Sequence, residues 1–165
     1  IVSSMEGSRP LLVEVQALVT SSSSIGMPRR MSAGFDHNRT SLLVAIMEKR
    51  LGMNLQGEDI FVNIVGGLKI SEPAVDMGVA AAIAGSFRNQ SVGPHTVIIG
   101  EVGLTGEVRS VMQLETRLTE VERLGFKRCI VPYSLKEDKL INKNSSLNLI
   151  PVKSFNERLY FKARF

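Results

Sequence analysis

Few residues of this 165-residue chain have the types and spacing that chemistry requires. The glycine-rich stretch GGLKIS at 66–71 lacks the G-x-x-x-x-G-K-[ST] spacing with which backbone amides cradle a phosphate. His37, His95 and Cys129 are not spaced like metal ligands. We therefore expect no nucleotide site and no metal site, two surface histidines, and a buried cysteine that acts as a small apolar residue. A Cys–His nucleophile pair is the alternative, which sequence spacing does not test.

The charge of the chain is unevenly distributed. Lys and Arg number 20 against 16 Asp and Glu, which gives a net charge of +4 and a pI near 9.5. Residues 108–165 carry twelve basic and six acidic side chains, whereas residues 70–107 carry one and four. A basic surplus favours an anionic partner, although solvated surface is the simpler explanation. No apolar run reaches the roughly 18–20 residues of a membrane span, so we expect no membrane partner.

Six basic residues stand near loop ends and helix starts, where they would line one edge of a sheet. They are Arg29, Arg30, Arg39, Lys69, Arg109 and Arg117. Such side chains bind phosphates regardless of base sequence, so they are our candidate DNA contacts. The chain has no Trp, two Tyr and seven Phe, so stacking on unpaired bases is disfavoured and contacts to the DNA backbone are expected. For each residue alone, an ordinary solvated side chain is the alternative.

Strands and helices alternate along the chain. Runs rich in β-branched residues predict strands at 11–20, 28–35, 60–65, 96–102, 127–132 and 147–152. The second of these would return as the partner of the first. The repeated Gly-Glu-Val at 100–102 and 106–108 predicts a tight hairpin.

Apolar spacing of 3.6 residues predicts an amphipathic helix over 37–51, with Asp36 as its N-cap and Gly52 at its end. A charged helix is expected over 113–124, and a short basic helix at the C-terminus. Residues 73–87 are nearly all apolar and predict a central, buried helix. The fold class is therefore α/β with a mixed β-sheet and packed helices, in a single domain over 1–165.

Four blocks, in order along the chain, resemble one known family. They are EGSRPLLVEVQALV at 6–19, PRRMSAGFDHNR at 28–39, VNIVGGLKISEPAVDMGVAAAIA at 62–84 and IGEVGLTGEVRSV at 99–111. Together they resemble the C-terminal, Lon-protease-like domain of the RadA (Sms) family of DNA repair and recombination ATPases. The resemblance covers most of the chain and becomes vague after Ser134. It implies a Lon-like fold of the ribosomal protein domain 2-like superfamily.

The resemblance also implies a function and partners. It implies DNA binding, single- or double-stranded, and assembly into a hexameric ring for branch migration, with a RecA-type recombinase as a further candidate partner. In this family a zinc finger and a RecA-like ATPase domain precede the Lon-like domain. We therefore expect a fragment without a cofactor of its own, since ATP, Mg and Zn belong to the missing domains. The expected location is a bacterial cytoplasm, or an organelle if the source is a plant.

Lon proteases use a Ser nucleophile and a Lys base, because a Ser hydroxyl is inert near neutral pH unless a base accepts its proton. By the resemblance, Asp76 stands at the Ser position and Glu115 at the Lys position. No Ser, Thr or Cys lies between Glu72 and Gly85, and no Lys lies between Glu101 and Phe126. We therefore expect no protease activity and no catalytic residue in this chain.

Other interpretations remain open. Asp76 and Glu115 would form a paired-carboxylate site if they approach each other. Otherwise Asp76 stabilises a helix N-terminus, and Glu115 pairs with Arg117, Lys69 or solvent. Lys69 with Ser71 would make a displaced dyad, as in an active Ser/Lys protease. A purely structural oligomerisation module without DNA contact is the last alternative.

Overall fold

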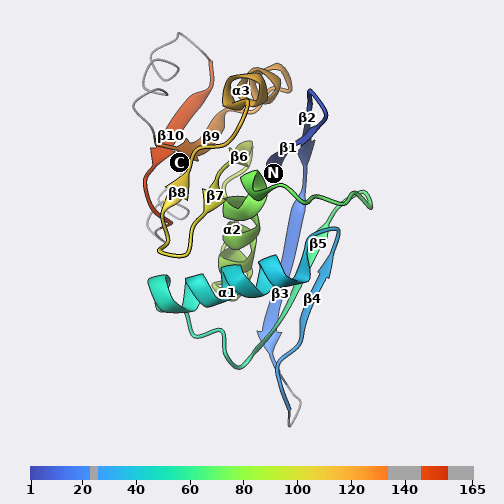
Figure 1. Ribbon diagram of the computed structural model, residues 1–165, viewed down its shortest axis with the longest axis vertical. Coiled ribbons are helices and arrows are strands. Elements are labelled where there is room, and N and C mark those ends of the chain that lie inside the picture. The colour runs from blue at the N-terminus through green and yellow to red at the C-terminus, as the bar shows by residue number, and fades with distance from the viewer. Residues whose placement is uncertain (23–25, 134–145, 156–165) are drawn as a thin grey trace.

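The computed structural model describes residues 1–22, 26–133 and 146–155 (Figure 1). They form two β-sheets, a short hairpin and three α-helices. The expected α/β class with mixed sheets is confirmed. The basic helix expected at the C-terminus lies outside the described residues. No helix within the described ranges is long and apolar enough to cross a membrane.

The larger sheet has five strands in the order β10-β9-β6-β1-β2. Its strands are β1 (Val2–Glu6), β2 (Arg9–Val13), β6 (Thr96–Ile98), β9 (Arg128–Pro132) and β10 (Asn148–Val152). All neighbours are parallel except β1 and β2, which form an antiparallel pair. The sheet is therefore mixed, and parallel strands of this kind need helices on their faces.

The smaller sheet has three strands in the order β3-β5-β4. They are β3 (Val15–Ser21), β4 (Arg30–Ala33) and β5 (Glu58–Ile64). β5 is antiparallel to β3 and parallel to β4. A separate hairpin consists of β7 (Glu101–Val102) and β8 (Val108–Arg109), as the repeated Gly-Glu-Val predicted.

Helix α2 (Asp76–Phe87) is the centre of the fold. It continues a single 3₁₀ turn over Pro73–Val75, and nine of its twelve residues are buried. Figure 1 shows α2 between the two sheets, with α1 (His37–Leu51) crossing it. The predicted caps of α1 are confirmed, because the Asp36 side chain accepts a hydrogen bond from the Arg39 N–H and Gly52 adopts a φ of 66°.

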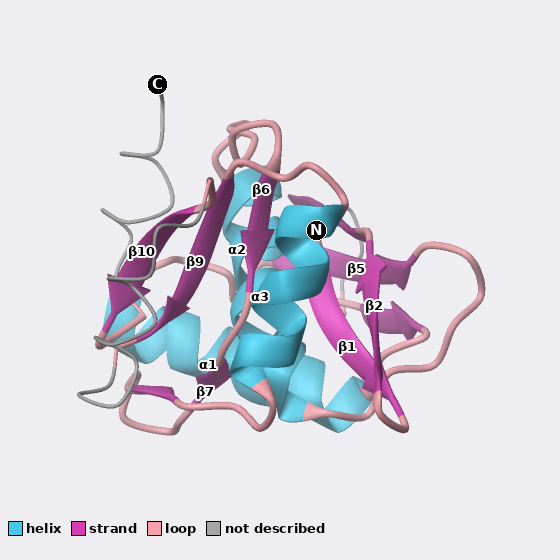
Figure 2. Cartoon of the chain, turned by 90° about the horizontal axis from the view of Figure 1, so that it is seen from above, coloured by secondary structure: helices cyan, strands magenta, loops and turns pink. Residues whose placement is uncertain are grey.

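Helix α3 (Leu114–Arg123) covers the opposite face of the five-stranded sheet from α2 (Figure 2). Side chains alternate between the two faces of a strand. Ile98 and Ile130 accordingly belong to the core around α2, whereas Val97 and Cys129 pack in a second core with Leu114 of α3. The two cores fix α2 and α3 on either side of one sheet.

Three strand predictions were wrong in their extent or pairing. Residues 11–20 are not one strand, because residues up to Val13 belong to β2 and pair with β1, whereas β3 begins at Val15 and pairs with β5 in the other sheet. The strand predicted over 28–35 pairs with β5 and not with its expected partner. The strand predicted over 96–102 is interrupted because the Gly100 N–H donates to the Ala74 carbonyl, at 2.8 Å.

Candidate functional site

A cleft of about 290 Å³ lies at the start of α2. It is lined by Phe35, Asp36, Arg39, Ile70, Ser71, Glu72, Pro73 and Asp76. The Ile70 N–H donates to the Gly34 carbonyl at 2.8 Å, which holds the segment leading into α2 beside the start of α1. Gly34 has a φ of +79°, and a Cβ there would lie 2.3 Å from the Leu68 carbonyl oxygen, so the cleft requires glycine at this position.

Asp76, in the first turn of α2, is fully buried at one end of this cleft. Arg39 of α1 binds both of its carboxylate oxygens, one of them through Nε at 3.0 Å. The Val102 N–H also donates to Asp76, at 3.2 Å. The carboxylate therefore ties the start of α2 to α1 and to β7, and its oxygens already have partners.

Burial and pairing act on the pKa of Asp76 in opposite directions. Burial raises its pKa above the usual value, against the opposing effect of the hydrogen bonds from Arg39 and Val102. The pKa of Arg39 is in turn raised, chiefly by its hydrogen bond to Asp76. The buried Asp76 carboxylate and Arg39 therefore form a structural ion pair. Removing either partner leaves the charge of the other uncompensated.

A second arginine–carboxylate pair joins α3 to the cleft. Arg117 is only 1% exposed, and its Nη atoms bind the two oxygens of Glu72 at 3.1 and 2.6 Å. The same guanidinium donates to the carbonyls of Ser3, at 2.7 Å, and Met112, at 3.0 Å. Glu72 also accepts the Met5 N–H, at 2.6 Å. This pair therefore connects β1, α3 and the segment before α2.

The Glu72 pair predicts a specific pH dependence of stability. Burial acts to raise the pKa of Glu72, but hydrogen bonds from Arg117, Ser4 and the Met5 N–H lower it below its usual 4.5. The ionised form is therefore favoured by folding, so its contribution is complete above pH 4.5 and is lost as the pH falls further.

Glu72→Gln is expected to unfold at a lower temperature than the wild type at neutral pH, because a neutral amide pairs more weakly with Arg117. Thermal unfolding followed by circular dichroism should show this difference narrowing as the pH falls below 4.5. A difference that stays constant into acid would contradict the assignment of Glu72 as the titrating partner.

The sequence singled out Asp76 and Glu115 as a possible pair of carboxylates, and the structure places them apart. Glu115 is exposed on α3 and does not line the cleft, whereas Asp76 is buried within it. Ser71 lines the cleft and Lys69 is exposed nearby in the sequence, but no hydrogen bond joins them among the described residues. The carboxylate that sequence reasoning missed is Glu72.

The six basic candidates do not line one edge of a sheet. β4 and β5 are parallel, so Arg30 at the start of β4 and Lys69 beyond the end of β5 lie at opposite ends of the smaller sheet. Arg109 belongs to the separate hairpin and Arg117 to α3. Because Arg39 and Arg117 direct their guanidinium groups to Asp76 and Glu72, neither group is free for a phosphate in this structure.

The other four candidates are at least partly exposed, and three of them have partners. Arg29 is paired with Asp59, and its guanidinium lies 5.6 Å from the centre of the Phe61 ring. Arg30 donates to the carbonyls of Glu58 and Leu55. Arg109 is 53% exposed and contacts Glu101 and Glu107, at 3.2 and 2.5 Å. Lys69 is exposed, and no ion pair is found for it within the described ranges.

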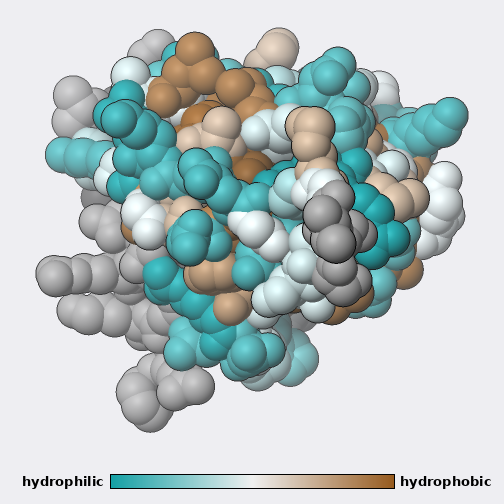
Figure 3. Space-filling model, turned by 90° about the horizontal axis from the view of Figure 1, so that it is seen from below, coloured by the Kyte–Doolittle hydropathy of each residue, from teal (hydrophilic) through white to brown (hydrophobic). Residues whose placement is uncertain are grey.

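Further basic side chains stand beside the β7–β8 hairpin. The side chain of Arg50, at the end of α1, lies against Gly106. The backbone of Lys153 is next to β8, because its carbonyl accepts the Val108 N–H at 2.9 Å, and its Nζ lies 4.3 Å from the centre of the Tyr133 ring. Figure 3 shows the molecule from below relative to Figure 1, where hydrophilic side chains are interspersed with less polar ones and a hydrophobic patch lies near one edge. Sequence reasoning missed Arg50 and Lys153, which only the fold brings to the β7–β8 hairpin.

The structure places the residues that metal or thiol chemistry would use. Within the described residues, no group of three or more His, Cys, Asp or Glu side chains is placed to hold a metal ion. His37 and His95 are exposed, as expected. Cys129 is fully buried in the sheet, and burial raises the pKa of its thiol far above the usual value. The side chain therefore stays in the protonated thiol form, which is a poor nucleophile.

Comparison with known proteins gives two consistent results. A family model described as "Subunit ChlI of Mg-chelatase" matches residues 14–134. The chain is 58% identical over 132 residues to a protein of Halalkalibacterium halodurans named DNA repair protein RadA, and 54% identical over 132 residues to one of that name from Bacillus subtilis. Each match covers 80% of this chain and 29% of the relative.

A protein of the same name from Listeria monocytogenes is 43% identical over 159 residues, which is 96% of this chain and 34% of the relative. The chain thus spans about a third of the length of the curated relatives that it matches. The resemblance to RadA that the sequence blocks indicated is confirmed.

Proposed function

The chain belongs to the ChlI family and matches DNA repair proteins named RadA over most of its length, and from this we propose that it is a non-proteolytic, Lon-like domain of a RadA-type DNA repair ATPase. The observation that carries the proposal is the 58% identity to such a protein over 80% of this chain. The bacterial origin of these relatives supports a role in a bacterial cytoplasm.

The arginine-held carboxylates of the cleft support the non-proteolytic part of the proposal. Hydrolysis by a Lon-type site needs a nucleophile and a base that exchange a proton. At the start of α2 the cleft instead contains Asp76, which Arg39 and the Val102 N–H already bind. Glu115, at the position of the lysine base, is exposed on α3. A buried carboxylate that is already bound by an arginine supports a structural role for Asp76 over a catalytic one.

DNA binding is proposed through the exposed basic residues. They are Arg29, Lys69 and Arg109, the partly exposed Arg30, and Arg50 and Lys153 beside the hairpin. Their exposure supports contact with phosphates, and the Glu101 and Glu107 partners of Arg109 would be exchanged for phosphate oxygens. Because these residues are spread over both ends of the smaller sheet and the hairpin, contact along an extended stretch of DNA fits better than a single pocket.

Assembly and motor work are proposed for the longer protein. In a hexameric ring this domain would be the scaffold that holds DNA near the axis, while a RecA-like motor binds ATP and Mg and a zinc finger binds Zn. Branch migration would then belong to the whole protein, with a RecA-type recombinase as a candidate partner. A purely structural oligomerisation module is the competing function, and DNA binding by this chain separates the two.

The test is fluorescence anisotropy of a labelled 30-base-pair duplex and of the matching single strand. Lys69→Gln and Arg109→Gln are expected to weaken binding without changing the unfolding temperature, because each removes one exposed charge. Arg123→Gln is the matched control, since Arg123 is an exposed arginine paired with Glu120 on α3 and lies outside the proposed set. Equal affinities for the three variants and the wild type would contradict the assignment of Lys69 and Arg109 as DNA contacts, and the absence of binding by the wild type would leave only the structural function.

A further inference from the structure

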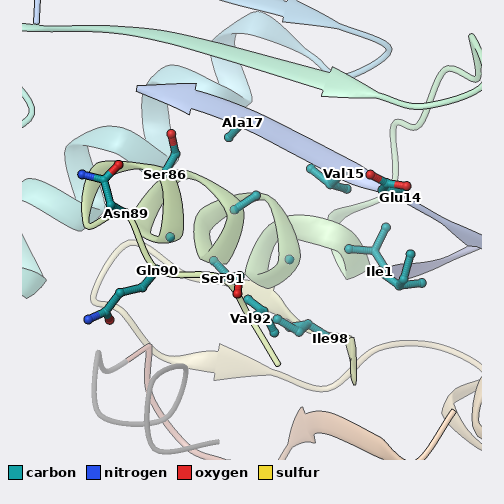
Figure 4. A pocket seen from close by; sticks show the side chains of 15 residues that line it. Ile1, Glu14, Val15, Ala17, Ser86, Asn89, Gln90, Ser91, Val92 and Ile98 are labelled. Atoms are coloured by element: carbon teal, nitrogen blue, oxygen red, sulfur yellow. The ribbon is translucent and has the colours of Figure 1, made fainter. Parts of the chain in front are cut away.

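A second groove, of about 520 Å³, lies along α2 and shares no lining residue with the cleft. Its floor is made of small residues on α2, namely Gly78, Ala81, Ala82 and Gly85. Its sides are formed by Val15 and Ala17 of β3, the first residues of the chain, Ile98 and the segment 89–92. Figure 4 shows β3 along one side of α2 and the residues Gln90 to Val92 along the other.

The strand on one side of this groove has an unpaired edge. β3 is the end strand of the smaller sheet, and its one partner among the described strands is β5. In an antiparallel pair, every second residue exchanges hydrogen bonds with the partner. The Val65 N–H donates to the Glu14 carbonyl, and the Ser22 N–H to the Gly57 carbonyl, both at 3.0 Å. The backbone N–H and C=O groups of the even-numbered residues of β3 therefore point toward β5.

The odd-numbered residues of β3 consequently turn their N–H and C=O groups to the outer side. Val19 shows this directly, because its N–H donates to the Ser86 hydroxyl of α2 at 2.9 Å. Val15 and Ala17 are the next two in the same series, and both line the groove. Their backbone groups repeat every two residues, at about 6.6–6.8 Å, which is the repeat of an extended chain.

The floor of the groove leaves room for such a chain. Glycine and alanine present no side chain beyond Cβ, so a strand lying beside β3 can pass close over α2. Ala82 is only partly buried, whereas most of its helix neighbours are buried. Glu14 is the charged side chain among the described residues of the lining. The groove therefore combines an open strand edge, a small apolar floor and one acidic end.

We propose that this groove binds an extended peptide segment of a partner protein, which adds as a strand to the open edge of β3. The open edge of β3 favours an extended peptide as the ligand, because only another extended backbone can form hydrogen bonds with its alternating N–H and C=O groups. The segment would carry small or β-branched apolar side chains at every second position, facing α2, and a basic residue near Glu14. This partner site is independent of DNA binding.

The probe is a set of heptapeptides selected by phage display on the wild-type chain, with binding measured by fluorescence polarisation. Selected peptides are expected to alternate apolar and polar residues and to carry Lys or Arg at one end. Methylating the backbone nitrogen of every second residue should abolish binding in one register and spare it in the other, because one set of N–H groups faces β3. Failure to select any peptide, or equal binding by both methylated forms, would overturn the proposal.

Ala82→Met tests the groove in the same measurement. The longer side chain would occupy the space above the floor of the groove, and methionine is compatible with a helix. The variant is expected to reduce peptide affinity at least tenfold and to leave DNA affinity unchanged. Ala45→Met is the matched control, because Ala45 is exposed on α1 away from the lining. Peptide binding that survives Ala82→Met would contradict the proposal. Loss of self-association in Ala82→Met by light scattering would show that a second copy, and not a partner peptide, occupies the groove.

Discussion

Replacing Arg117 with methionine is expected to lower the free energy of unfolding by about 3 kcal/mol. Arg117 is 1% exposed, and its loss leaves Glu72 without its cation and the Ser3 and Met112 carbonyls without a donor. Methionine fills part of the space but offers no hydrogen bond. Urea unfolding followed by circular dichroism measures the difference, which corresponds to a decrease of roughly 10 °C in the melting temperature for a chain of this size.

Two variants make this result specific. Arg123→Met changes an arginine on the same helix that is 65% exposed and paired with Glu120, and it is expected to lower the stability far less than Arg117→Met, because water screens an exposed ion pair. Arg117→Lys keeps the charge but loses the planar fork that binds both Glu72 oxygens, so an intermediate loss is expected. Similar losses for Arg117→Met and Arg123→Met would contradict the structural importance of the buried pair.

Asp76→Ala is expected to destabilise the protein by about 2–3 kcal/mol. The change leaves the Arg39 guanidinium without its counter-charge and the Val102 N–H without an acceptor. It also removes a negative charge from the first turn of α2, where the helix dipole favours one. Asp76→Asn keeps an acceptor for Val102, so a smaller loss is expected, and urea unfolding compares the two.

The double variant Arg39→Met, Asp76→Ala shows how much of the stability lost in Asp76→Ala comes from the uncompensated charge of Arg39. If the ion pair is structural, adding Arg39→Met should recover part of the stability that Asp76→Ala loses. Hydrolysis of casein should stay at the buffer rate for the wild type and for Asp76→Ser, since no lysine lies between Glu101 and Phe126 to accept the serine proton. Hydrolysis by the wild type that disappears in Asp76→Ala or Lys69→Ala would establish a protease instead.

Local elements were predictable from the sequence because their determinants are close together in the chain. Helix α1 begins and ends where Asp36 and Gly52 predicted, since an N-cap and a left-handed residue act within one turn. Strand pairing was not predictable in this way. β3 pairs with β5, some 40 residues later, and no local pattern distinguishes that partner from β4.

The candidate site was predictable in its residues but not in its contacts. The resemblance to the Lon-like family directed attention to Asp76, yet its partner Arg39 comes from a different helix. The burial of Arg117 could have been predicted from the helical spacing of α3. Leu114, Arg117 and Val121 lie on one face of this helix, and all three are buried. An arginine on an apolar face predicts a buried partner, and only the fold brings Glu72 to it.

The salt dependence of duplex DNA binding by the wild-type chain tests the central claim most directly. A domain that binds phosphates through exposed Lys and Arg side chains must release counterions, so log affinity should fall linearly with log salt, by about 0.9 for each phosphate contacted. We expect a slope that corresponds to at least two contacts, reduced by about one in Lys69→Gln. The absence of DNA binding at low salt, or an affinity that salt does not change, would contradict the claim that this domain binds DNA.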